Sequence, residues 1–293
     1  MSHMLDHHPQ LAWCLGFEFA VTYLGGDGRP PRLEDFYRHL EVNRPFQTLG
    51  YRIDRSLEYP ALVRDFLRQE RAADGKPLVG ATVHLHFDRL RRLFPACRFI
   101  HLLRDGRDVS RSCMAMGWAG NGWYGAQRWL DAEQLWDRVR AGLRPDDFCE
   151  VRYENLINAP VAELTRICAF IGIPYAPAML RYPEDTAYPP PQVQWIGQWR
   201  QLPAPEIQRI EARLDPLLRV RAYPPSGMPP RAVGWLERQW LREHDRYARI
   251  AFRVRRNGWR LVAADILARQ LRLTAWTRRI QQRLNAIETR HLK

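Results

Sequence analysis

The sequence lacks a hydrophobic run long enough to span a bilayer, and it lacks a cysteine pattern that holds a metal. A membrane helix needs roughly 18 or more apolar residues, whereas the apolar stretch at residues 11–24 contains Glu18 and follows no basic segment typical of a signal peptide. The five cysteines are scattered and form no Cys-x-x-Cys pair. We therefore expect reduced thiols, a cytoplasmic location, no metal and no disulfide framework.

The net positive charge is small in most of the chain and concentrated at its end. The net charge is +13, and residues 231–293 contain 16 Lys and Arg against 5 Asp and Glu, a net of +11. The first 230 residues are therefore nearly neutral. This distribution makes nucleic acid an improbable partner for the protein as a whole. It also separates residues 1–223 from a basic extension at residues 224–293, which begins in a proline cluster.

Short apolar runs alternate with helical segments in the first part of the chain, which predicts an α/β domain. Residues 78–85 and 97–103 resemble strands on either side of a helical segment at 87–94, and a third strand is expected at 148–153. This order is typical of parallel strands that are buried on both faces. Helices are predicted at residues 2–6, 33–40, 60–71 and 160–171, and in the extension at 232–256 and 259–287.

The segment FIHLLRDGRDVSRS, residues 99–112, carries the strongest chemical signal. An apolar strand ends at Arg104, and a helix begins directly afterwards. Ligands of open α/β sheets bind at such strand ends, and a helix N-terminus favours an anion. The Arg104 guanidinium can donate two hydrogen bonds to a phosphate, and Ser112 follows eight residues later. An alternative is that Arg104 pairs with Asp108 at the helix start, where Asp105 and Asp108 suit capping.

Several motifs in order resemble the sulfotransferase family that uses 3′-phosphoadenosine 5′-phosphosulfate (PAPS). LFPACRFIHLLRD resembles the family's FPDARFIHLVRD, and VRYENLINAP at residues 151–160 resembles its RYEDL segment. WIGQWR at residues 195–200 resembles its late Gly-x-Trp segment, and MSHMLDHHPQLA resembles the helix after its RSGTTLL loop. The resemblance covers about residues 2–223.

The resemblance implies a fold, a reaction and three binding residues. The fold would be a parallel sheet like that of P-loop NTPases, flanked by helices. In relatives an Arg and a Ser eight apart hold the 3′-phosphate of PAPS, which assigns Arg104 and Ser112 to that role. The tyrosine of the RYEDL segment lies beside the adenine, which assigns Tyr153. No metal takes part in this transfer.

The family's glycine-rich loop, which cradles the 5′-phosphosulfate with backbone N–H groups, has no counterpart here. The resemblance starts where that loop ends, so either the start of the gene was placed too late or the protein lacks its first strand and loop. Loss of that strand predicts an exposed edge and apolar face in the parallel sheet. The late loop also departs from relatives that have an Arg-Lys-Gly triplet, since Gln192, Val193 and Gln194 take its place, and Arg200 is a candidate substitute cation.

A threonine takes the place of a lysine that relatives have at a strand end, and two histidines follow it. Relatives have a lysine at the end of the strand before the FPDARF segment, and alignment on Gly80 places Thr82 there. His84 then falls where one branch of the family has a catalytic histidine, which makes His84 the candidate base and His86 its neighbour. Alternation along a strand puts both on one face. A buried structural role for one of them is the alternative.

We therefore expect a sulfotransferase that moves a sulfuryl group from PAPS to a hydroxyl or amine acceptor. Aromatic residues at 118–124 either line an acceptor pocket or belong to the core, whereas Trp129 and Trp136, seven residues apart, suit the core. The first rival is a non-catalytic relative that binds adenosine 3′,5′-bisphosphate. The second is a protein that acts through its basic extension, which either packs on the main domain, contacts an anionic membrane surface or binds nucleic acid.

Overall fold

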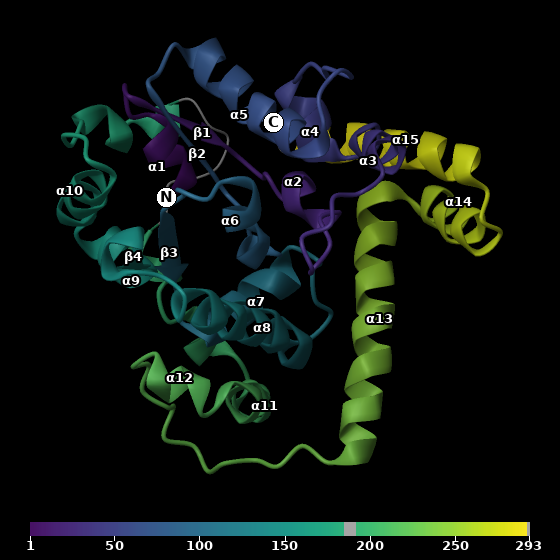
Figure 1. The fold of residues 1–293 in the computed structure, drawn as a ribbon. Coiled ribbons are helices and arrows are strands. Elements are labelled where there is room, and N and C mark those ends of the chain that lie inside the picture. Colours follow the sequence, from purple (N-terminus) through teal and green to yellow (C-terminus); the bar gives the residue numbers. More distant parts are fainter. Residues whose placement is uncertain (185–191, 292–293) are drawn as a thin grey trace.

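A computed structural model describes residues 1–184 and 192–291 and has the predicted α/β class (Figure 1). Two pairs of parallel strands are surrounded by helices. Strand β1 pairs with β2 and β3 pairs with β4, with Leu11 opposite Leu78 and Phe99 opposite Phe148. The strands are β1 (Leu11–Cys14), β2 (Leu78–Ala81), β3 (Phe99–Leu103) and β4 (Phe148–Arg152).

The helices of residues 19–74 and Cys14 of β1 enclose one apolar core, whereas Met4 and Leu5 of the first helix pack in another. Aromatic rings dominate the first of these cores: Phe19 contacts Phe46 and Phe66 edge to face, with ring centroids 5.3 and 6.0 Å apart. Such geometry adds to the stabilisation from burial. The helices are α1 (Ser2–Asp6), α2 (Phe19–Thr22), α3 (Leu33–Leu40), α4 (Arg44–Leu49) and α5 (Tyr59–Asp74).

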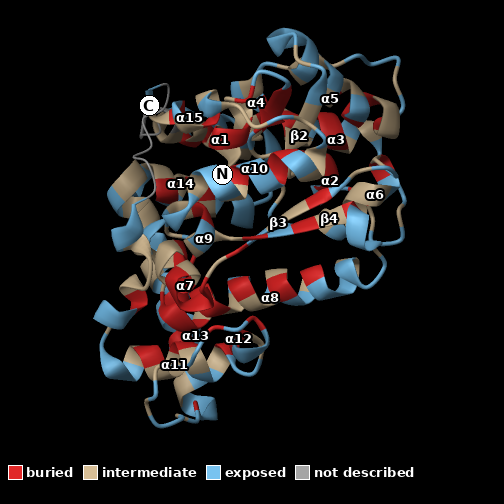
Figure 2. Cartoon of the chain, turned by 90° about the vertical axis from the view of Figure 1, so that its left-hand side faces the viewer, coloured by how far each residue is buried: buried red, intermediate tan, exposed pale blue. Residues whose placement is uncertain are grey.

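Helix α7 lies at the centre of the second half of the domain, and half of its residues are buried, most of them in its first turns (Figure 2). It follows β3 directly, and α8 returns beside it. Trp129 and Trp136 of α8 are buried, in agreement with the core interpretation of their spacing. The helices are α6 (Leu90–Leu93), α7 (Gly106–Ala115), α8 (Gly122–Arg140), α9 (Tyr153–Asn158) and α10 (Pro160–Ile171).

Strand β2 is shorter than the apolar run that predicted it. It ends at Ala81 rather than at residue 85, so β-alternation does not govern the orientation of His84 and His86. His86 has a φ of 57°, in the left-handed region, which no strand residue adopts. A 3-10 helix, η1 (Phe87–Arg89), and α6 complete the connection to β3.

The strands do not form one continuous sheet, although the strand–helix–strand order suggested neighbours. Strand β2 pairs with β1, and β3 pairs with β4. A cavity of about 1920 Å³ lies between the pairs, lined by residues of both β2 and β3. The prediction that a strand edge and apolar surface are exposed agrees with this arrangement, because Leu78 and Leu102 of these strands are more than a third exposed.

The C-terminal extension contains three helices and not the two that the sequence predicted. The expected helix at 259–287 is broken after Gln270, where Arg272 has a left-handed φ of 53°. Among the described residues, no helix is both long enough and apolar enough to cross a membrane. The last helices are α11 (Ala204–Leu214), α12 (Leu217–Val220), α13 (Trp235–Asn257), α14 (Trp259–Gln270) and α15 (Thr274–His291).

The extension packs against the main domain at two distant places (Figure 1). Near its first end, the buried Asp245 of α13 accepts a hydrogen bond of 2.7 Å from the Gly120 N–H. Near its second end, Arg278 of α15 forms an ion pair of 2.9 Å with Glu41, just after α3. Packing on the domain, one of the roles considered for the extension, therefore accounts for part of its surface.

Candidate active site

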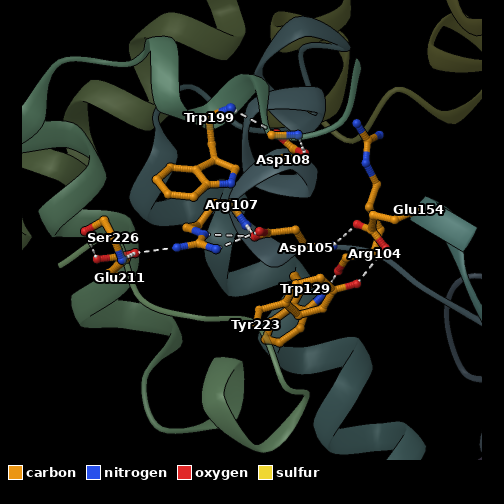
Figure 3. A network of polar contacts seen from close by, with 11 residues as sticks. Arg104, Asp105, Arg107, Asp108, Trp129, Glu154, Trp199, Glu211, Tyr223 and Ser226 are labelled. Atoms are coloured by element: carbon orange, nitrogen blue, oxygen red, sulfur yellow. Dashed lines mark hydrogen bonds and ion pairs between the residues drawn. The ribbon is translucent and has the colours of Figure 1, made fainter. Parts of the chain in front are cut away.

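The buried guanidinium of Arg107 organises the turn between β3 and α7 (Figure 3). Asp105 is the N-cap of α7 and accepts a hydrogen bond of 2.9 Å from the Arg107 N–H. The Arg107 side chain is 1% exposed and pairs with the carboxylates of Asp105 at 2.7 Å and Glu211 at 2.6 Å. Its Cζ atom also lies 3.6 Å from the ring centroid of Trp199. The strand end, α11 and the late loop are thereby joined.

Asp108 attaches the late loop to the first turn of α7. Its carboxylate accepts hydrogen bonds from the backbone N–H groups of Gly197 at 2.7 Å and Trp199 at 2.9 Å. Burial raises the pKa of the Asp108 carboxyl, and the two backbone hydrogen bonds oppose that shift. Asp105 caps α7, whereas Asp108 fixes the WIGQWR segment against the strand end and does not have the capping role that the sequence suggested.

Arg104 lies at the carboxyl end of β3 with one buried donor unused. Its Nη2 donates to the Trp195 carbonyl oxygen at 2.9 Å, and its Cζ lies 4.3 Å from the ring centroid of Tyr153. Among the described residues, no hydrogen bond or ion pair joins Arg104 to Asp108. The buried Nε of Arg104 has no partner in that part of the chain either. Arg104 and Asp108 therefore form no direct pair in the described chain, although Arg104 is close enough to lower the pKa of the Asp108 carboxyl.

Tyr153 and Glu154 follow β4 directly, at the start of α9, and contact the turn after β3. Burial raises the pKa of Tyr153, and the nearby Arg104 opposes the shift. Glu154 accepts hydrogen bonds from the Asp105 N–H at 3.1 Å and from the Tyr223 hydroxyl at 2.9 Å. Sequence reasoning did not assign Glu154, although its place in the RYEN segment was a signal.

Ser112 lies two turns into α7, as its spacing predicted, and is half-buried. In the described part of the chain, no hydrogen bond joins its hydroxyl to Arg104. The structure thus brings Arg104 and Tyr153 into contact and leaves Ser112 as a neighbour on the adjoining helix. Its assignment to the 3′-phosphate stays a prediction.

His84 lies in the loop after β2, and 69% of its side chain is exposed. Its backbone N–H donates to Glu18 Oε1 at 2.9 Å, and its Nε2 lies 3.9 Å from the same oxygen. His84 and Arg104 both line the cavity between the strand pairs. The neighbouring His86 is half-buried, and desolvation together with Arg89 lowers its pKa.

Three further residues of the sequence analysis have defined places. Thr82, aligned with the family's lysine, accepts a hydrogen bond of 2.8 Å from Trp13 Nε1 and therefore has a structural partner. Arg200, the candidate substitute cation, is exposed, and its Cζ lies 4.6 Å from the Trp199 ring centroid. Trp118 is 50% exposed and lines the same cavity as His84.

Comparison with known proteins identifies the family of this chain. A model described as "Sulfotransferase family" matches residues 1–177, which is more than half of the chain. The chain therefore belongs to the sulfotransferase family. A solved sulfotransferase domain from the curacin biosynthetic pathway aligns with a TM-score of 0.43 at 19% identity, over 73% of this chain and 91% of that one.

Among curated relatives, two kinds of sulfotransferase are similar to this chain. The omega-hydroxy-beta-dihydromenaquinone-9 sulfotransferase Stf3 of Mycobacterium bovis is 27% identical over 205 residues, or 62% of this chain and 50% of that protein. The protein-tyrosine sulfotransferase of Drosophila melanogaster is 25% identical over 162 residues, or 47% of this chain and 32% of that protein. The chain spans half or less of the length of these relatives.

Asp108→Ala is expected to release the late loop, because it leaves two backbone N–H groups without their charged acceptor. We expect the free energy of unfolding to fall by about 2–3 kcal/mol in urea denaturation. Tryptic cleavage after Arg200 should accelerate in the native state, since local opening becomes easier. Asp131→Ala, which removes an exposed carboxylate on α8, should change neither quantity; equal effects of the two substitutions would contradict the role given to Asp108.

Proposed function

We propose that this chain is a PAPS-dependent sulfotransferase that modifies a hydroxyl or amine acceptor. The observation that carries the proposal is the Arg104 guanidinium, whose buried Nε has no partner among the described residues. It lies at a strand end, against the face of Tyr153, and a buried unpaired donor on a cation favours an anionic ligand. Arg104 and Ser112 would hold the 3′-phosphate of PAPS, and Tyr153 would border the adenine.

The reaction needs little covalent chemistry from the protein. The acceptor oxygen or nitrogen forms a bond to sulfur, and the bond from sulfur to the 5′-phosphate oxygen breaks, which leaves adenosine 3′,5′-bisphosphate. The acceptor proton passes to a base. We assign that base to His84, because it lines the same cavity as Arg104 and its exposed ring is accessible to an acceptor. Positioning and charge stabilisation supply the remainder of the rate.

The rival within the family is a non-catalytic chain that binds the bisphosphate product without turning over PAPS. Both proposals require nucleotide binding at Arg104, and only the first requires transfer.

The lining of the cavity favours an apolar or aromatic acceptor, because Trp118 and Tyr124 line it together with His84.

Arg104→Ala should weaken the binding of adenosine 3′,5′-bisphosphate to the full chain by about tenfold to a hundredfold, because it removes a charge-assisted contact. Isothermal titration calorimetry measures this. Ser112→Ala should give a smaller loss, since it removes a neutral donor. Arg38→Ala, on the exposed surface of α3, is the matched control and should bind like the wild type. A folded wild-type chain that binds no nucleotide would refute the proposal.

His84→Asn should lower kcat for sulfuryl transfer by about a hundredfold or more, because general base catalysis contributes factors of that size. Nucleotide affinity should stay unchanged, since His84 is not placed on the phosphate. Transfer from radiolabelled PAPS to a panel of phenols and alcohols provides the measurement. His86→Asn is the control: if it abolishes transfer while His84→Asn does not, the base has been misassigned. Nucleotide binding without transfer to any acceptor favours the non-catalytic rival.

One observation favours a second role, contact of the extension with an anionic membrane surface. Helix α13 carries an exposed apolar stripe opposite its buried face, with Leu236, Trp240 and Tyr247 being 74%, 58% and 73% exposed. These positions recur at helical spacing on one side. Many of the remaining residues are arginine, and such helices bind at the boundary of headgroups and acyl chains. The location would then be peripheral to a membrane.

The full chain should co-sediment with phosphatidylserine vesicles and not with phosphatidylcholine vesicles, and added salt should weaken the binding. Replacement of both Leu236 and Trp240 by Ser should lower the bound fraction several-fold, because apolar burial is lost. Val193→Ser, which removes a 61% exposed apolar residue from the late loop, should have no effect. Binding that is insensitive to lipid charge and to the double substitution would exclude this role.

A further inference from the structure

Helices α8, α11 and α13 meet at the start of the extension. Trp123 of α8 is buried in a small apolar cluster with Val233, just before α13, and Leu241, within it. The Arg209–Glu237 ion pair of 2.8 Å joins α11 to α13. None of these residues lines the cavity between the strand pairs, so a ligand at this junction does not compete with one in that cavity.

Arginines outnumber carboxylates at the junction. Arg209 pairs with Glu206 at 2.7 Å as well as with Glu237, and Arg231 pairs with Glu237 at 2.7 Å. Both carboxylates are therefore already engaged by these two arginines. In the described chain the following arginines of the junction have no carboxylate partner: Arg213 of α11 and Arg238 of α13.

The charge of Arg213 is held in place without being neutralised. Its Nε is buried and has no hydrogen-bond partner among the residues that the structure describes. Its Cζ lies 4.3 Å from the ring centroid of Trp123, so an aromatic face fixes the plane of the guanidinium. Burial lowers the pKa of Arg213 and the positive charge of Arg238 lowers it further, whereas Tyr124 and Asp131 oppose the shift.

Arg238 lies on the exposed side of the first turns of α13. Its Nε donates to the Val233 carbonyl oxygen at 2.9 Å, which orients the side chain. The guanidinium groups of Arg238 and Arg213 are close enough for their charges to repel. An anion shared between them would replace this repulsion by two attractions.

The unpaired charges indicate the chemistry of the ligand. A guanidinium donates paired hydrogen bonds to phosphate oxygens. A phosphate monoester carries a charge of about −1.5 to −2 at neutral pH and three acceptor oxygens, which suits two adjacent arginines better than a singly charged carboxylate or phosphodiester. Trp235 lies three residues before Arg238, on the same side of α13, and is 69% exposed, so an apolar group on the ester has a surface to contact.

We propose that Arg213 and Arg238 form a second anion site, which binds a phosphate monoester between α11 and α13. The ester belongs either to a small soluble molecule or to a lipid headgroup of the phosphatidic acid type, because the two present the same group. The bound anion bridges the main domain and the extension. The site uses none of the residues assigned to PAPS and is independent of sulfuryl transfer.

Isothermal titration calorimetry with glycerol 3-phosphate tests the site in the full chain carrying Arg104→Ala, so that phosphate binding at the candidate active site does not contribute. We expect saturable binding that Arg213→Met and Arg238→Met each weaken by about tenfold or more, because each removes charge-assisted hydrogen bonds. Methionine keeps an apolar side chain over the aromatic ring. Arg219→Met, which removes an exposed arginine paired with Asp215 on α12, is the matched control and should leave binding unchanged.

Two further ligands separate a phosphate monoester site from general attraction of anions. Dimethyl phosphate has the same tetrahedral phosphorus but a single charge, and it should bind much more weakly than glycerol 3-phosphate. Vesicles with phosphatidic acid should bind more chain than vesicles with phosphatidylglycerol at equal surface charge if the ester belongs to a lipid, and Arg213→Met should abolish the difference. Equal binding to both kinds of vesicle, with glycerol 3-phosphate still bound, identifies a soluble ester.

Two outcomes would overturn the inference. The first is a folded chain that neither binds glycerol 3-phosphate nor prefers phosphatidic acid. The second is binding that survives both Arg213→Met and Arg238→Met. Circular dichroism and thermal melting verify folding, and because Arg238 is exposed, its substitution tests the site independently of any effect of Arg213→Met on stability. Neither outcome bears on nucleotide binding at Arg104 in the wild-type chain, so the two proposals fail separately.

Discussion

The buried guanidinium of Arg107 is the interaction on which the region around the candidate site depends. Its charge is compensated by Asp105 and by Glu211, and Glu211 lies 104 residues further along the chain. The Trp199 ring covers the face of the guanidinium. A buried charge that loses one partner is costly, by about 3–5 kcal/mol. The strand end, α11 and the late loop are thus held in one arrangement, and Arg104 is presented beside them.

The same network explains why Arg104 and Arg107, three residues apart in the turn, make different contacts. Arg107 is fully engaged with protein groups, whereas Arg104 keeps one buried donor unpaired. The two side chains differ because they point in different directions. Asp105 caps α7 and pairs with the Arg107 side chain, which is buried. The Trp129 indole N–H donates to the Arg104 carbonyl oxygen at 2.9 Å and fixes the backbone from which the Arg104 side chain extends. Arg107 stabilises the region, whereas Arg104 combines contacts to Trp195 and Tyr153 with an unpaired Nε.

Local patterns predicted the helices better than the strands. The bounds of α3 and α10 match their predicted ranges, because amphipathic spacing and flanking glycine or proline mark helix ends. Strand β1 was missed, since four apolar residues within a longer apolar stretch carry no distinct period. The end of β2 was placed four residues late, because the apolar run continues into a loop that Glu18 holds by hydrogen bonding.

The candidate site was predictable where its residues belong to one motif and unpredictable where partners are distant. Arg104 and Tyr153 were identified from their motifs, and they do make contact. The bonds of Asp108 to the late loop cross 89 and 91 residues, and no local spacing encodes them. The contact of Glu154 with Tyr223 crosses 69 residues.

The path of the extension has a consequence for how the chain responds to force and heat. Helix α13, with 23 residues, is roughly 34 Å long. Its first turn is joined to α11 by the Glu237–Arg209 ion pair, and its middle is joined to the α7–α8 turn by Asp245. Asn285 of α15 then donates to the Val42 carbonyl at 2.8 Å, near the Glu41–Arg278 pair. The last part of the chain is thereby fastened to its first fifty residues. Loss of α15 therefore removes partners of residues 41–44, and the C-terminal helix and the segment after α3 are expected to loosen together.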